Sequence, residues 1–190
     1  MIRVIGCSIL ISVVSLMLSA CQSTQESMDR IRIKQAVNIN NNINNALVYC
    51  SGAQNCEFAR LDHMSIVDAQ SKRINPEAIQ NGWVRLTGQP LSQNGLYLDI
   101  PAKQHELVLR FYPISTQRAE VFHVIHQFKP KHHYSFKMYR QRNSHTGSLL
   151  NVSAPTPLCV DLMQEQQLLR RFCRPFNAVT GVSEFVEQKI

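Results

Sequence analysis

The N-terminal segment constrains this chain more than any other part of its sequence. Arg3 is followed by an apolar run over residues 4–18, and small residues then precede Cys21. A basic start, an apolar middle and small residues before a cleavage point are typical of a secretory signal. The run is shorter than the roughly 20 residues that a membrane-spanning helix needs. We therefore expect residues 1–20 to be a signal peptide, and the rest to fold in an oxidising compartment.

The end of this segment, Leu18-Ser19-Ala20-Cys21, resembles the lipobox of bacterial lipoproteins. The resemblance implies that Cys21 receives a diacylglycerol on its sulfur and becomes the acylated N-terminus. The next residue is Gln22, not the aspartate typical of lipoproteins kept at the inner membrane. This implies an anchor in the outer membrane, facing the periplasm. We expect a short tether over residues 21–27 and a single folded domain over residues 28–190.

Charge and length narrow the class of partner. The chain carries a formal net charge of +7. An exported lipoprotein does not ordinarily meet nucleic acid, so we expect its partners to be anionic lipid, peptidoglycan carboxylates or an acidic protein. About 170 residues remain after cleavage, which is enough for one domain with a sizeable core.

Cysteines provide the second strong constraint. Outside the signal and the lipid site, four remain: Cys50, Cys56, Cys159 and Cys173. An even number in an oxidising compartment predicts two disulfides. Three pairings are possible, and we favour Cys50–Cys56 with Cys159–Cys173. Zinc binding is the alternative, but these spacings match no usual zinc finger.

Register supports the second of these bridges. A hairpin of Leu158–Met163 with Leu169–Arg174 can place Cys159 opposite Cys173. The same register places Asp161 opposite Arg171, Val160 opposite Phe172 and Met163 opposite Leu169. One ion pair and two apolar pairs would thus form together across the strands. The tip, Glu165-Gln166-Gln167, lacks the Gly or Asn that tight turns favour.

Apolar spacing predicts the remaining elements. Mostly helical spacing predicts a helix over Met28–Tyr49, although its many asparagines are poor helix formers. The Cys50–Cys56 bridge would then join that helix to the first strand. From Glu57 onward, short alternating segments predict strands, and Val121–Phe128, apolar on both faces, predicts a central one. The strands are expected over Glu57–Leu61, Met64–Val67, Trp83–Thr87, Leu96–Ile100, His105–Tyr112, Val121–Phe128 and residues 134–139.

The predicted fold class is mainly β: an antiparallel β-sandwich with an N-terminal α-helix packed on it. The segment Leu98–Leu107 also resembles the strand–turn–strand unit of small immunoglobulin-like or transthyretin-like modules in envelope lipoproteins. The resemblance extends over residues 96–140. It departs from those modules at the turn, where Lys103-Gln104 replaces their usual glycine. It favours a sandwich and implies nothing about a ligand. The final segment, residues 175–190, could form either a strand or a short helix.

One stretch has an uneven charge. Residues 121–160 contain no Asp or Glu, but they hold five basic side chains and five histidines. These side chains could form a docking face for anionic lipid, glycan or an acidic partner, or simply a solvated rim. The basic residues are Lys129, Lys131, Lys137, Arg140 and Arg142.

No pattern predicts a metal, a cofactor or a reaction. His123 and His126 on one strand would point to opposite faces. Gly-x-Ser-x-Gly and His-Glu-x-x-His motifs are absent. Asp62-His63 suggests a dyad, but neighbours on a strand rarely face each other. We therefore predict a structural or docking protein without catalysis. The alternative is a glycan- or peptidoglycan-binding module using Trp83, Tyr97 and Tyr112.

Overall fold

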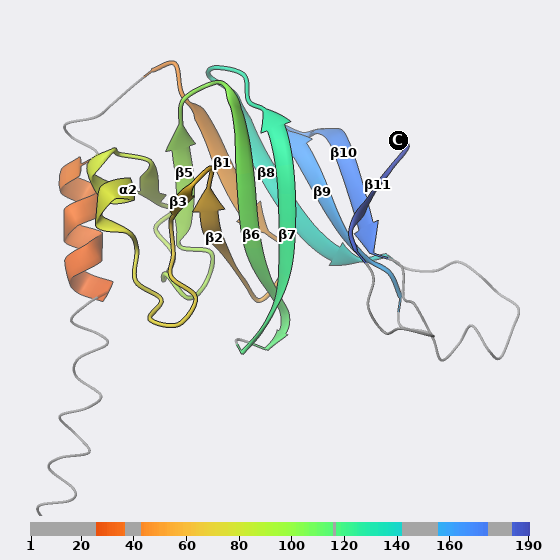
Figure 1. Cartoon of the computed structure of the whole chain (residues 1–190), viewed down its shortest axis with the longest axis horizontal. Helices are drawn as coiled ribbons and strands as arrows, with labels where there is room; N and C mark the ends of the chain where they lie inside the picture. Colours follow the sequence, from red (N-terminus) through yellow and green to blue (C-terminus); the bar gives the residue numbers. More distant parts are fainter. Residues whose placement is uncertain (1–25, 37–42, 116, 142–155, 175–183) are drawn as a thin grey trace, which may run out of the picture.

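Two β-sheets face each other in the computed structural model (Figure 1), which describes residues 26–36, 43–115, 117–141, 156–174 and 184–190. The larger sheet has the strand order β11-β10-β9-β8-β1-β5-β4, and the smaller has the order β3-β2-β6-β7. The predicted mainly β sandwich with an N-terminal helix is confirmed. The elements are β1 (Ala46–Ser51), β2 (Asn55–Leu61), β3 (Met64–Ser65), α2 (Pro76–Gln80), β4 (Val84–Leu86), β5 (Leu96–Ile100), β6 (Gln104–Ser115), β7 (Arg118–Gln127), β8 (His133–Arg140), β9 (Leu158–Gln164), β10 (Gln167–Arg174) and β11 (Val186–Gln188).

The core lies between the sheets. Successive side chains of a strand point to opposite faces, so each sheet can bury one face and leave the other at the surface. Burying an aliphatic or aromatic side chain contributes roughly 1.5–3 kcal/mol, so this layer supplies the main stabilisation. The fully buried side chains include Val48, Leu98, Phe136 and Val160 from the larger sheet and Phe58, Leu109 and Phe122 from the smaller.

The predicted helix over Met28–Tyr49 is wrong in its second half. Residues 26–36 are helical, whereas Ala46–Ser51 forms β1. Residues 37–42 lie outside the described part of the chain. In β1 every second residue is buried, which is the period of a strand. This strand pairs antiparallel with β5 and parallel with β8, and these tertiary contacts override the helical spacing.

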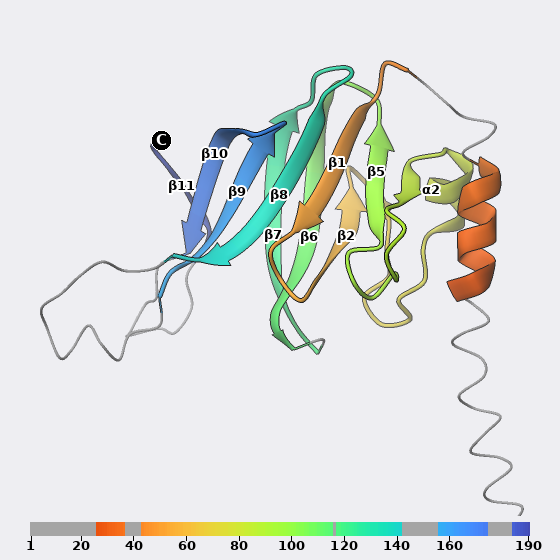
Figure 2. The same cartoon turned by 180° about the vertical axis from the view of Figure 1, so that it is seen from behind.

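The helix over residues 26–36 packs at the end of the sandwich that carries α2 (Figures 1 and 2). Ile33 is fully buried and belongs to the main core. Arg30 Nη2 donates a hydrogen bond to the Gln89 carbonyl at 2.9 Å, and Glu26 Oε1 accepts one from the Leu91 N–H at 3.3 Å. The helix is therefore fixed to the domain.

The predicted bridge between Cys50 and Cys56 is confirmed, but it joins different elements. It connects β1 of the larger sheet to β2 of the smaller, and so links two sheets rather than a helix and a strand. Gly52 in the intervening turn has φ +88°, and a Cβ there would lie 2.1 Å from the Met138 carbonyl oxygen. Only glycine allows the turn to approach β8 this closely.

The second bridge, Cys159–Cys173, is also confirmed, together with its predicted register. Asp161 pairs with Arg171, and Val160 pairs with Phe172. The pairing of Met163 with Leu169 is wrong, because an irregularity between residues 168 and 170 shifts Leu168 opposite Met163. A two-residue turn at the tip is formed by Glu165, at φ +53°, and Gln166.

Strand β7 was predicted to be central and is instead an edge strand of the smaller sheet. Val121 and Ile125 on its outer side are 59% and 52% exposed. The edge of β7 that does not pair with β6 is partly covered by the larger sheet, because Arg170 Nη1 of β10 donates a hydrogen bond to the Ile125 carbonyl at 2.8 Å. The described part of the C-terminal segment contains strand β11, whereas residues 175–183 lie outside the described chain.

Candidate functional site

The outward side of the larger sheet forms an open surface of the domain. In Figure 2, no described helix or strand crosses β1, β8 or β9 on this side. We call it the outer face. Its residues alternate with core residues along each strand, which explains why they point outward. They are Tyr97 of β5, Tyr49 of β1, His133, Ser135, Lys137 and Tyr139 of β8, Asp161 and Met163 of β9, and Arg171 of β10.

Two tyrosines stack on this face. The rings of Tyr49 and Tyr97 lie 4.8 Å apart between centroids and are 18° from parallel. On its other side, Tyr49 has the His133 ring at 6.2 Å. Burial, followed by the nearby Tyr97 and Asp99, raises the pKa of Tyr49. The ring of Tyr49 is therefore a neutral platform held in place by a second aromatic ring.

Beside this platform lies an open pocket of about 610 Å³. Its lining residues combine an aromatic ring with a carboxylate, an amide, a hydroxyl and an imidazole, which are groups that bind polar ligands. They are Tyr49, His133, Tyr134, Ser135, Glu165 and Gln166.

The carboxylate of this pocket is fixed by the β9–β10 turn. The Glu165 N–H donates to the His133 carbonyl at 2.8 Å, and Glu165 Oε1 accepts from the His133 N–H at 2.9 Å. The hydrogen bond from His133, opposed by desolvation and aided by His132, lowers the pKa of Glu165. At neutral pH the pocket therefore carries a fixed negative charge.

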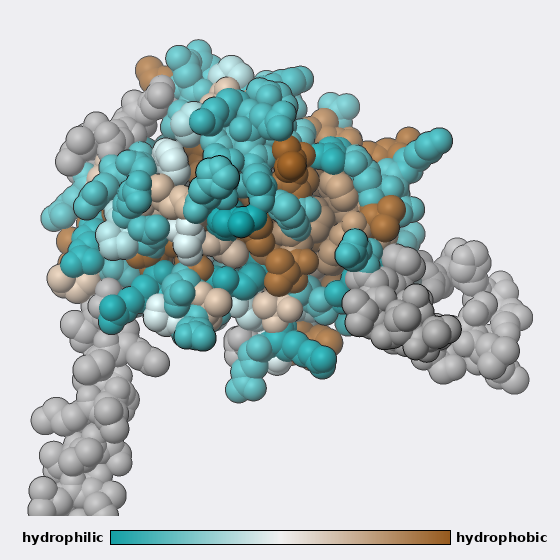
Figure 3. All heavy atoms as spheres, in the orientation of Figure 1, coloured by the Kyte–Doolittle hydropathy of each residue, from teal (hydrophilic) through white to brown (hydrophobic). Residues whose placement is uncertain are grey.

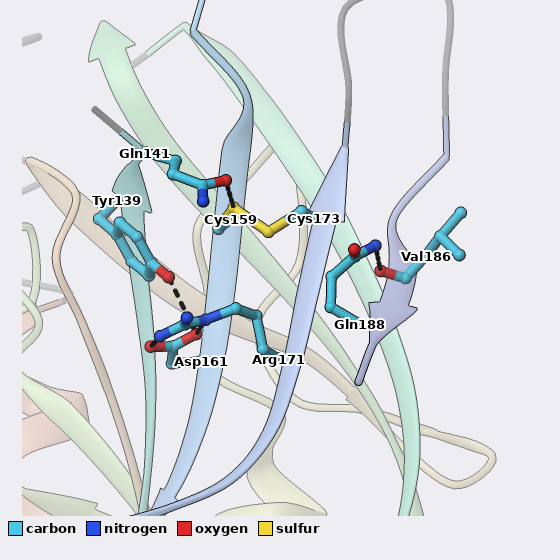
Figure 4. The surroundings of a disulfide bond; sticks show 8 residues. All are labelled: Tyr139, Gln141, Cys159, Asp161, Arg171, Cys173, Val186 and Gln188. Carbon is cyan, nitrogen blue, oxygen red and sulfur yellow. Dashed lines mark hydrogen bonds and ion pairs between the residues drawn. A yellow bond between two sulfur atoms is a disulfide. The ribbon is translucent and has the colours of Figure 1, made fainter. Parts of the chain in front are cut away.

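A second cluster on the outer face lies near the Cys159–Cys173 bridge (Figure 4). Arg171 donates two hydrogen bonds to Asp161, each of 2.8 Å, and the Tyr139 hydroxyl donates to Asp161 at 3.2 Å. These bonds to Asp161 raise the pKa of Arg171. Lys137 is directly opposite Asp161 across β8 and β9 and is exposed. The cluster is thus a preorganised ionic surface with one projecting cation.

The structure does not bring together the four described basic residues of the predicted docking face. Lys129 and Lys131 lie in the turn before β8, Lys137 lies on the outer face, and Arg140 ends β8. Nine residue steps of mostly extended chain lead from Lys131 to Arg140, which is about 30 Å. Arg142 lies outside the described residues. The basic stretch therefore follows a strand from end to end and is not a compact patch.

The aromatic residues of the predicted glycan site are also separated. Tyr97 is on the outer face, Trp83 packs against the core, and Tyr112 is buried on the opposite sheet. The aromatic ring that lies beside Tyr97 is that of Tyr49, not Trp83 or Tyr112. The sequence does not reveal this pair, because its apolar spacing predicts a helix at Tyr49. Once β1 is recognised as a strand, its alternation places Tyr49 on an outer face.

Asp62 does pair with a histidine, but not with its neighbour His63. Asp62 Oδ2 lies 2.8 Å from Nδ1 of His105 on β6. The other ring nitrogen lies 2.9 Å from the Pro101 carbonyl oxygen, and His105 is only 1% exposed. Both ring nitrogens are therefore occupied, and the ring is closed to a substrate. Desolvation opposes ionisation of Asp62, but hydrogen bonds from the Glu106 N–H and His105 outweigh it and lower its pKa.

Two further features limit the chemistry of the described residues. Among them, no group of three or more His, Cys, Asp or Glu side chains is placed to hold a metal ion. The two histidines of β7 point in different directions: His123 contacts Glu106 at the surface, and His126 packs against Phe128.

No helix within the described ranges is long and apolar enough to cross a membrane.

The described part of the outer face thus combines a stacked tyrosine pair, a pocket with a carboxylate and an ionic cluster. Comparison with protein-family models, with curated proteins and with solved structures finds no match to this chain.

Proposed function

We propose that this chain is a lipid-anchored envelope protein that acts as a docking or accessory subunit, without catalysis. In this proposal Cys21 carries the lipid, the anchor is in the outer membrane, and the domain faces the periplasm. The two disulfides support an oxidising compartment. Cys21 itself lies outside the described residues.

The outer face carries the proposal. Its aromatic and ionic side chains are already held by stacking and by paired hydrogen bonds, so little side-chain freedom would be lost on binding. Lys137 projects from this ordered surface, and its ammonium has no ion pair with the residues that the structure describes. An acidic protein surface would complement it.

Site-specific photo-crosslinking in cells tests the docking role. A photoreactive amino acid at Lys137 should give an adduct with one stoichiometric envelope protein. The matched control is the same substitution at Ile114, which is 67% exposed near the end of β6 in the opposite sheet. Equal adducts from both positions, or none from Lys137, would refute docking through the outer face.

The anchor is tested separately by Cys21→Ala. The variant should appear in the soluble periplasmic fraction, because the acyl chains would be missing. Continued association with the outer membrane would show that something other than the lipid retains the protein.

The pocket beside Tyr49 favours a second candidate function, glycan or peptidoglycan binding. A ring backed by Tyr97 can stack against a sugar, while Glu165, Gln166 and Ser135 can bind its hydroxyl or amino groups. Sedimentation with purified peptidoglycan distinguishes this candidate from protein docking. Tyr49→Ala should abolish sedimentation, whereas Tyr139→Ala, on the same face but outside the pocket, should not.

A further inference from the structure

The helix over residues 26–36 has an apolar side that the domain does not cover. Met28 and Ile31 are 46% and 52% exposed, and residues three apart lie on one side of a helix. The opposite side is fixed in the domain by Ile33, which is fully buried. The helix therefore presents two apolar side chains outward while its orientation relative to the sandwich is held.

Cationic side chains flank this apolar pair. Lys34 is exposed, and the half-exposed Arg32 lies 3.7 Å from Asp29. Arg30 is used differently, because it pairs with Glu26 and bonds the Gln89 carbonyl. An apolar side with cations beside it is the pattern of helices that lie in the interface of an anionic bilayer.

Chain length determines what this side can meet. Five peptide steps separate Cys21 from Glu26, the first described helical residue, and they span at most about 18 Å when fully extended. The helical segment itself is about 16 Å long. If Cys21 is acylated, Glu26 therefore lies within about 18 Å of the membrane surface, and the far end of the helix lies within about 35 Å of it.

We infer that the outward side of this helix lies on the anionic bilayer that holds the lipid, with Met28 and Ile31 entering the headgroup layer and Arg32 and Lys34 contacting lipid phosphates. The inference rests on the proposed lipid anchor. Retention comes from the lipid, and the helix contributes orientation. Because Ile33 fixes the helix to the core, contact along the helix holds the entire sandwich at one angle to the membrane.

Fluorescence quenching by brominated lipids tests the contact. Full-length lipidated protein carrying Ile31→Trp is reconstituted into vesicles of phosphatidylethanolamine and phosphatidylglycerol brominated near the headgroup end of their acyl chains. The matched control is Ile114→Trp, which is also exposed but lies at the C-terminal end of β6 in the smaller sheet. The native Trp83 is the common background. We expect the added emission of Ile31→Trp to be quenched at least twofold more than that of Ile114→Trp.

A second variant tests the charge component. Arg32→Glu combined with Lys34→Glu should reduce quenching of Ile31→Trp on anionic vesicles, but should have little effect on phosphatidylcholine vesicles. Equal quenching at Ile31→Trp and Ile114→Trp, with acylated Cys21 confirmed by mass spectrometry of the same sample, would overturn the helix contact and leave the anchor intact. An unacylated Cys21 would overturn the anchor, and the helix orientation with it.

Discussion

The Glu57 cluster on the smaller sheet and the Lys137 region of the larger sheet differ in how completely their charges are paired. Figure 3 shows the outer side of the smaller sheet, where hydrophilic side chains cover most of the surface. On this sheet the Glu57 carboxylate accepts from Arg110 at 3.1 Å and from the Tyr112 hydroxyl at 2.9 Å, and it also pairs with Lys72. On the larger sheet, Arg171 pairs with Asp161, but the neighbouring Lys137 makes no ion pair with the described residues. Charges that neutralise one another stabilise the domain, whereas an uncompensated charge on an ordered surface is available to a partner. The first arrangement supports the fold, and the second supports recognition.

The sharpest way to break this contrast is Glu57→Ala. The side chains of Glu57 and Arg110 are only 11% and 13% exposed, so the variant would leave the Arg110 guanidinium largely buried without its anion. We expect a loss of about 3 kcal/mol in the free energy of unfolding, measured by urea denaturation. Glu106→Ala removes the partner of Arg60, where the two side chains are 31% and 45% exposed, and should cost about 1 kcal/mol. Equal losses would contradict the distinction between the two clusters.

A smaller stability effect is expected on the outer face. Asp161→Ala removes the partner of Arg171, whose side chain is 36% exposed and can be solvated by water. The expected loss is therefore about 1 kcal/mol in the same assay. Asp161→Asn, which keeps an oxygen for Arg171, should lose less. A loss as large as that of Glu57→Ala would place this cluster among the main supports of the fold.

Acid should weaken the interactions of two carboxylates, Asp62 and Glu165. The pKa values of Asp62 and Glu165 are lowered from their ordinary values of 3.8 and 4.5. Each ionised group therefore stabilises the fold above its ordinary pKa, and the contribution is lost as pH falls through the folded pKa. The free energy of unfolding should decrease below about pH 4.5. Asp62→Asn should show a shallower decrease than the native protein in urea denaturation at several pH values; an unchanged slope would contradict its role.

The smallest stability effect, and the largest effect on binding, is expected from Lys137→Glu. Lys137 has no ion pair to lose among the described residues, but the new carboxylate would lie opposite Asp161, so the free energy of unfolding should fall by about 0.5 kcal/mol. Once the crosslinked partner is identified, its affinity for this variant should fall at least tenfold. The control is Lys129→Glu, in the turn before β8. If both variants lose affinity equally, the whole basic stretch contributes rather than the outer face.

Local patterns predicted much of the fold. Leu96, Leu98 and Ile100 alternate as β5 requires, and the charged and apolar pairs of β9 and β10 determined the register of their bridge. The error at β1 came from residues whose spacing fits both a helix and a strand. Ala46 suits a helix or a strand, and only pairing with β5 and β8 decides between them.

The candidate site was less predictable, because it is assembled across the sheet. Tyr49 and Tyr97 are far apart in sequence and meet only because β1 lies beside β5. Glu165 enters the pocket through a turn at positive φ that its sequence did not suggest. The apolar side chains of Val121 and Ile125 led to the wrong prediction that β7 is a central strand. Both are exposed, and an apolar residue type alone does not show whether a side chain is buried.

The position of β1 has a consequence for folding kinetics. It is the first described strand in the chain, yet it lies between β5 and β8 and pairs with both, and these two strands come much later in the sequence. Apart from β1, the larger sheet consists of two groups, β4–β5 and β8–β11, with no direct pairing between them. Closing the sheet therefore waits for contacts between residues about 50 and 85 positions apart, and high contact order slows folding. During that interval the unpaired strands are exposed to aggregation, so assembly of this domain should depend on how quickly β1 is captured.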